Sequence, residues 1–149
     1  MEKDLNAAYK FITLPQKCGI HGGLGFMFKS SFVQYIEKHH QISDRVGVID
    51  LKLLSQPKDT FIRFVNVYGP TLEKSIRNPQ LTEDFYHQIQ KVTDETPKHW
   101  EIIILGDFSA RLGMKEDVKD NDSETEEWIH TSCGKYGYGG KNENGNHLL

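Results

Sequence analysis

Asp107 is the residue whose position most favours chemistry. It follows Gly106 at the end of a largely aliphatic run over residues 100–105, which predicts a short strand buried on both faces. A carboxylate at the C-terminal end of such a strand, with a low dielectric behind it, can take a proton from water or bind a divalent cation. Capping of a turn is the alternative interpretation, and it is the more common role of a single aspartate after a strand and a glycine.

Tyr68 is the second candidate. It ends a run of β-branched and aromatic residues over positions 61–68, directly before Gly69-Pro70. A tyrosine at this point projects its hydroxyl beyond the sheet, although a partly buried aromatic ring with a hydrated tip explains the pattern equally well. Because both candidates follow strands, we expect Tyr68, Asp107 and Ser109 to lie in one cleft at the C-terminal ends of the strands.

Strands dominate the elements that must position these residues. Alternating or continuous apolar patterns predict strands at residues 11–14, 22–28, 45–54, 61–68 and 100–105. A turn at residues 57–59 joins the third and fourth as a hairpin. His39 and His40 are expected in a polar loop. The order of elements favours an α/β fold with an antiparallel or mixed sheet.

One helix is expected between Asn78, as the N-cap, and Pro97. Its apolar side chains recur at helical spacing and form one stripe, made of Leu81, Phe85, Ile89 and Val92. We expect this stripe to pack on the outer face of the sheet.

Composition narrows the class of protein. The chain has 149 residues, enough for one domain, and its 18 basic and 21 acidic side chains give a net charge of −3. This excludes a strongly basic nucleic-acid coat but leaves a local basic groove open. Two cysteines cannot form a disulfide scaffold and fit a reducing compartment. The N-terminus lacks the basic and then apolar order of a signal peptide, and no aliphatic run is long enough to cross a membrane. We therefore expect an intracellular protein.

Two further patterns carry weaker hypotheses. The pairs Cys18/His21 and His130/Cys133 have the residue types of a zinc site, but free thiols and surface histidines are the favoured interpretation. The glycine-rich stretch 134–145 is not a P-loop and is expected to lead into a helix capped near Asn144. Its lysines, Lys135 and Lys141, are either contacts for a nucleic-acid backbone or solvated side chains.

Four segments, taken together, resemble the endonuclease/exonuclease/phosphatase superfamily in order and spacing. They are residues 22–26 (GGLGF), 67–71 (VYGPT), 106–113 (GDFSARLG) and 134–145 (GKYGYGGKNENG). Within the superfamily the chain is most similar to LINE-type retrotransposon endonucleases and the related craniofacial development protein 2-like proteins. The resemblance covers residues 19–149 as a partial domain and leaves 1–18 as a weakly defined N-terminal segment.

The resemblance implies a two-layer α/β sandwich that hydrolyses phosphodiesters with Mg²⁺, commonly by nicking DNA. Tyr68 occupies the position of a tyrosine that contacts the scissile phosphate, and Asp107 that of the aspartate that orients or deprotonates the attacking water. Asp107 is also the expected metal ligand, and Ser109 stands where the family has a catalytic asparagine. DNA is the implied partner, with no membrane and no small-molecule cofactor, and the nucleus is a candidate compartment.

Departures from the family pattern favour an alternative function. Serine offers one short hydroxyl where asparagine offers an acceptor and two donors. The family's N-terminal Asn and Glu motifs and its C-terminal Ser-Asp-His motif have no counterpart, so the domain is expected to be incomplete at both ends, with exposed sheet edges. The alternative is a catalytically inert fragment or binding module, and we expect the chain alone not to nick DNA above background.

Overall fold

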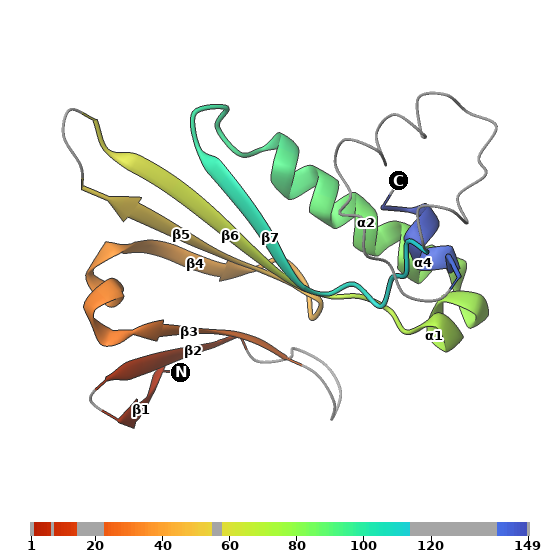
Figure 1. Cartoon of the computed structure of the whole chain (residues 1–149), viewed down its shortest axis with the longest axis horizontal. Coiled ribbons are helices and arrows are strands. Elements are labelled where there is room, and N and C mark those ends of the chain that lie inside the picture. Colours follow the sequence, from red (N-terminus) through yellow and green to blue (C-terminus); the bar gives the residue numbers. More distant parts are fainter. Residues whose placement is uncertain (1, 7, 15–22, 55–57, 114–139, 149) are drawn as a thin grey trace. The chain divides into compact units, whose positions relative to one another are not determined.

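The computed structural model describes residues 2–6, 8–14, 23–54, 58–113 and 140–148. The chain divides into two compact units, the first made of Met1–Tyr68 and His87–Gly106, the second of Gly69–Tyr86 and Asp107–Leu149. The boundary between Tyr86 and His87 falls inside helix α2 (Pro79–Asp94), shown in green in Figure 1.

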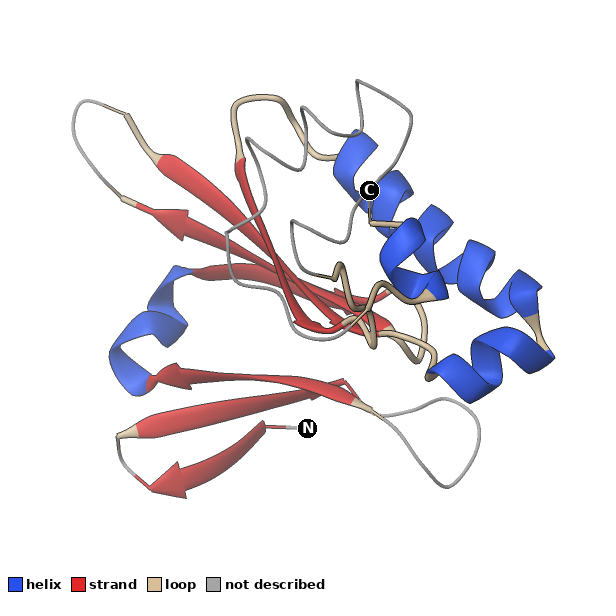
Figure 2. Cartoon of the chain, turned by 45° about the vertical axis from the view of Figure 1, so that its right-hand side comes forward, coloured by secondary structure: helices blue, strands red, loops and turns tan. Residues whose placement is uncertain are grey.

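The first unit contains two sheets, and their strands are drawn in red in Figure 2. The first sheet has the order β1-β2-β3, with β1 at Glu2–Asn6, β2 at Tyr9–Leu14 and β3 at Leu24–Lys29. A 3-10 helix, η1 (Ser30–Tyr35), leads to the second sheet. That sheet has the order β4-β5-β6-β7, with β4 at Ile36–Gln41, β5 at Val46–Leu53, β6 at Thr60–Tyr68 and β7 at Glu101–Asp107.

The second sheet is mixed. β5 pairs with both β4 and β6 in antiparallel register, and the expected β5–β6 hairpin is confirmed, with Val46 opposite Val67. β6 and β7 run in the same direction (Figure 1). At their C-terminal ends Gly106, with a φ of +137°, lies so close to the backbone of Val67 that a Cβ atom would overlap it. Glycine is therefore required where β7 ends.

The core of the first unit lies between the two sheets. Its central side chains come from β2, β3 and β5, and they are Ile12, Leu14, Phe26 and Ile49. β5 is buried along most of its length on both faces, because it lies between two paired strands and carries apolar side chains on each side. An α/β fold with two sheets, as the sequence predicts, is confirmed.

Helix α2 begins at Pro79, as predicted, and ends at Asp94, three residues before Pro97. Of the predicted stripe, Phe85 and Val92 are buried and Leu81 and Ile89 are partly buried, while its packing on the outer face of the sheet stays a prediction. No helix in the described part of the chain is long and apolar enough to span a membrane.

Two sequence predictions are wrong. The β7 strand is not buried on both faces: it is the last strand of its sheet in the described part of the chain, and Ile103, Ile104 and Leu105 are 42%, 37% and 39% exposed. His39 and His40 do not form a loop: they lie in β4 opposite Ile49 and Val48, so pairing with an apolar strand outweighs their own polarity.

Four elements were not expected from the sequence. They are β1, η1, β4 and a short helix, α1 (Leu72–Arg77). The cysteine and histidine pairs considered for zinc (Cys18, His21, His130 and Cys133) lie outside the described residues, as does Lys135.

Candidate functional site

The loop that follows β7 presents the carboxylate of Asp107. The side chain is exposed, and its Oδ1 accepts hydrogen bonds from the backbone nitrogen of Ser109 at 2.7 Å and from the Ser109 hydroxyl at 3.4 Å. Asp107 therefore caps its own turn, which is the alternative that the sequence left open. Ser109 takes a φ of +50°, a left-handed conformation that is uncommon for residues other than glycine.

The loop after β6 contacts this turn directly. The backbone nitrogen of Gly69 donates to the carbonyl oxygen of Asp107 at 2.6 Å, and a side chain at Gly69 would overlap the carbonyl group of Phe108. The segments that follow the two parallel strands thus lie backbone against backbone within the second unit.

Asn142 joins the Asp107 loop to a short helix, α4 (Glu143–Asn146). Its Oδ1 accepts from the backbone nitrogens of Gly145 at 2.9 Å and Arg111 at 2.8 Å, and its Nδ2 donates to the carbonyl of Ser109 at 3.0 Å. Asn142 is therefore the N-cap of α4, so the helix expected at the end of the glycine-rich stretch is present and its cap lies two residues before Asn144.

Asn144 lies within α4 and is completely buried. Its Nδ2 donates to the carbonyl oxygens of Pro70 at 2.7 Å and Ser109 at 3.2 Å, while its Oδ1 accepts from the Ser75 hydroxyl at 2.8 Å. Parts of three of the four motif segments are thus held together by two asparagines. This role was not expected from the sequence, although the asparagine-rich stretch 142–146 is typical of side-chain caps.

Tyr68 ends β6 in the first unit, with 41% of its surface exposed. Arg45, a site residue not expected from the sequence, holds Tyr68 in place. The backbone nitrogen of Tyr68 donates to the carbonyl of Arg45, and Nη1 of Arg45 donates to the carbonyl of Tyr68, both at 2.9 Å. The guanidinium also lies 5.6 Å from the centre of the Tyr68 ring, a cation–π contact.

The structure brings Asp107 and Ser109 together in the second unit, whereas Tyr68 belongs to the first. A cleft shared by all three stays a prediction. So does Mg²⁺ binding by Asp107. The described residues contain no group of three or more His, Cys, Asp or Glu side chains that could hold a metal ion, and Asp107 is one carboxylate. A hard cation needs several oxygen ligands, so Mg²⁺ at Asp107 would need further oxygen ligands beside this carboxylate.

No protein-family model matches the chain, and no curated protein sequence matches it significantly. The resemblance of the four motif segments is therefore a similarity of residues and their order.

Proposed function

We propose that this chain is a domain of the endonuclease/exonuclease/phosphatase type, related to LINE-type retrotransposon endonucleases, and that its chemistry is the Mg²⁺-dependent hydrolysis of DNA phosphodiesters. The observation that carries the proposal is the role of Asn144, which bonds to both Pro70 and Ser109. These carbonyls belong to the two motif segments that, by resemblance, contact the phosphate and activate the water. Their direct connection is what a common site for both segments requires.

Asp107 and Tyr68 have separate roles in this proposal. The exposed carboxylate of Asp107 accepts a proton from the attacking water, which makes that water a better nucleophile. The Tyr68 hydroxyl donates to a phosphate oxygen, where negative charge accumulates during the attack. Arg45 positions Tyr68 through the two hydrogen bonds and the cation–π contact described above.

A non-catalytic module derived from such a domain is the second candidate function. One observation favours it: Oδ1 of Asp107 is engaged by the backbone of Ser109, so the carboxylate has a structural task that does not need a substrate. The short hydroxyl of Ser109 also supplies less hydrogen bonding to a phosphate than an asparagine would.

A nicking assay on supercoiled plasmid DNA with Mg²⁺ distinguishes the two. Asp107→Asn keeps an oxygen that can cap the turn but removes the base, so the fold is preserved while the proton acceptor is lost. The matched control is Asp84→Asn, an exposed aspartate on α2 whose hydrogen-bond partner is Gln80.

Nicking by the unaltered chain that falls about 100-fold or more in Asp107→Asn, but not in Asp84→Asn, supports the hydrolase. Equal background nicking by all three folded proteins supports the non-catalytic module.

A further inference from the structure

Asn144 is the one asparagine of the chain that a glycine follows. Asparagine is chemically labile, because the backbone nitrogen of the next residue can attack its side-chain amide and close a succinimide ring. Glycine permits this attack most readily, since it carries no side chain to obstruct it. In an unfolded chain Asn144 is therefore the asparagine most prone to deamidation.

The fold nevertheless requires both residues of this pair. Asn144 is completely buried and donates to the carbonyls of Pro70 and Ser109, as described above. A Cβ atom at Gly145 would overlap the carbonyl group of Arg111. Replacement of either residue by a chemically more stable one therefore costs packing or hydrogen bonds in the second unit.

The same contacts restrain the atoms that take part in deamidation. The Gly145 nitrogen, which is the nucleophile, donates to Oδ1 of Asn142 at 2.9 Å. Nδ2 of Asn144, which leaves as ammonia, donates to the Pro70 carbonyl at 2.7 Å, and Oδ1 of Asn144 accepts from the Ser75 hydroxyl at 2.8 Å. Ring closure has to break these hydrogen bonds first, so the closed structure blocks the reaction.

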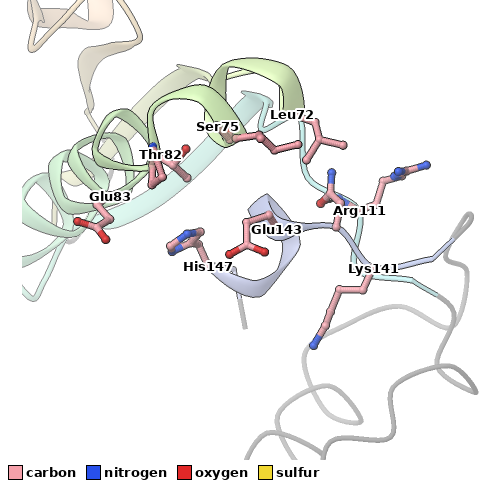
Figure 3. A pocket seen from close by; sticks show the side chains of 11 residues that line it. Leu72, Ser75, Thr82, Glu83, Arg111, Lys141, Glu143 and His147 are labelled. Carbon is pink, nitrogen blue, oxygen red and sulfur yellow. Dashed lines mark hydrogen bonds between the residues drawn. The ribbon is translucent and has the colours of Figure 1, made fainter.

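Helix α4, which carries the pair, has the features of a segment that opens locally. It consists of 4 residues, and a helix of this length is not stable without tertiary contacts. Figure 3 shows α4 next to a cavity of about 570 Å³, lined on this side by the exposed residues Glu143 and His147. A segment that is exposed along one side opens at a lower free energy than the core of a protein does.

We propose that Asn144 is a deamidation site, blocked while α4 is closed and reactive once α4 has opened. In the open form the Gly145 nitrogen gives up its proton to hydroxide and bonds to Cγ of Asn144. The Cγ–Nδ2 bond then breaks, and Nδ2 takes up a proton and leaves as ammonia. Water opens the ring to give aspartate or isoaspartate, so each event consumes one water molecule and releases one ammonia.

Deamidation makes the opening of α4 permanent. A carboxylate at this position has no hydrogen to donate, so the carbonyls of Pro70 and Ser109 lose their buried donor. The negative charge would also lie against these two carbonyl oxygens, and burial of an unpaired charge is strongly unfavourable. Helix α4 therefore cannot close again. This consequence does not depend on hydrolysis at Asp107.

The first test follows deamidation of the full chain by peptide mass spectrometry, in buffer and in urea at a concentration that unfolds the protein. A peptide of residues 140–148, in the same two solvents, measures the effect of urea on the chemistry itself. We expect Asn144 in the folded chain to react at least about tenfold more slowly than in the peptide, because only the open fraction reacts. The chain in urea should react as fast as the peptide does. An equal rate in the folded chain and in the peptide overturns the proposal.

The second test asks whether modified chains can refold. The chain is held in urea until part of Asn144 and Asn146 has deamidated, the urea is removed, and refolded chains are separated from expanded ones by size-exclusion chromatography. We expect chains with a carboxylate in place of the Asn144 amide to collect in the expanded fraction. Asn146, exposed on the same helix, is the matched control, and its aspartate form should occur equally in both fractions. Equal distribution of both modified forms overturns the proposal that the opening becomes permanent.

The third test changes the restraint on the nucleophile. Asn142→Ala removes the acceptor of the Gly145 nitrogen and the N-cap of α4, so we expect Asn144 to deamidate several-fold faster in buffer. Asn142→Asp keeps the capping oxygen and should raise the rate less. The control is Gln80→Ala, which removes an exposed amide bonded to Asp84 on α2 and should leave the rate unchanged. A rate in Asn142→Ala equal to that of the unaltered chain overturns the blocking role of α4.

Discussion

Asp107 and Ser109 form one hydrogen-bonded turn in which the carboxylate accepts from the backbone nitrogen two residues later, at 2.7 Å. The turn places Ser109 at a φ of +50°. Asparagine adopts this left-handed backbone more readily than other residues with a Cβ atom, because its short polar side chain can bond locally. The position where the resemblance places asparagine is thus also one where the backbone favours asparagine.

Replacement of Ser109 by asparagine should therefore stabilise the protein. We expect Ser109→Asn to raise the free energy of unfolding by about 0.5 kcal/mol, and Ser109→Val to lower it by about 1–2 kcal/mol, because a β-branched residue tolerates positive φ poorly. Urea denaturation measures both. Equal stability of the asparagine and valine variants would show that the positive φ at position 109 does not determine the stability differences.

Asn144 should be the residue on which the second unit depends most. Asn144→Ala leaves the Pro70 carbonyl without its buried donor and removes the acceptor for the Ser75 hydroxyl, and we expect a loss of about 2–4 kcal/mol. The control is Asn146→Ala, an exposed asparagine of the same helix, with a change within about 0.5 kcal/mol. Denaturant midpoints give both values, and similar losses at the two positions would show that the asparagine network contributes little.

The elements that the sequence predicts correctly are those that depend on residues close together in the chain. The β-branched residues of β5 and β6 are of the types enriched in strands, and Asn78-Pro79 marks the start of α2 before any packing is known. The turn of Asp107 is equally local, since its partner is two residues away.

The features that were missed depend on distant residues. Asn144 bonds to Pro70, 74 positions earlier in the chain, and no short window of sequence contains both. His40 lies in a strand because Val48 pairs with it, and β7 is exposed because of its place in the sheet rather than its composition. Pairing and strand order are tertiary properties, so local patterns could not predict them.

A buried ion pair in the first unit should contribute strongly to its integrity. Arg63 bonds both carboxylate oxygens of Asp50, at 2.7 and 2.8 Å, and also the Thr96 hydroxyl after α2 at 2.9 Å. Asp50→Ala leaves a largely buried guanidinium without its partner, and we expect a loss of about 3–5 kcal/mol.

The control for this pair is Asp59→Ala. Asp59 pairs with Lys52 at 3.3 Å, with about a third of each side chain exposed, and solvent weakens such pairs, so the loss should stay below about 1 kcal/mol. Thermal unfolding measures both variants. Losses of similar size would mean that burial of the Asp50–Arg63 pair is not what makes it important.

His40 should make stability depend on pH. Burial lowers its pKa below the ordinary 6.5, and the positive charges of Lys38, Arg63 and His39 lower it further, while Asp50 opposes them. In the pH range just below 6.5 the unfolded chain thus binds more protons at this position than the folded chain, and stability falls as the pH falls.

Replacement of His40 by glutamine should therefore reduce the loss of stability between pH 7 and pH 5. His39→Gln, at an exposed position of the same strand, is the control and should change the slope less than His40→Gln does, because His39 contributes the smallest of the charge effects on the pKa of His40. Urea denaturation across this range gives the slopes. A slope unaltered in His40→Gln would assign the pH dependence to other groups.

The exposed apolar side chains of β7 should promote self-association. Ile103 and Leu105 share one face of the strand, Ile104 lies on the other, and β7 is the last strand in the order of its sheet. An edge strand with exposed apolar residues can pair with another chain, and a lysine placed there opposes such pairing.

We expect Ile103→Lys to shift the protein toward monomer in size-exclusion chromatography with little change in Tm. Leu54→Lys removes a side chain that is 71% exposed outside any strand and should leave the elution profile unchanged. An equal shift in both variants would attribute the association to general surface hydrophobicity rather than to the edge of β7.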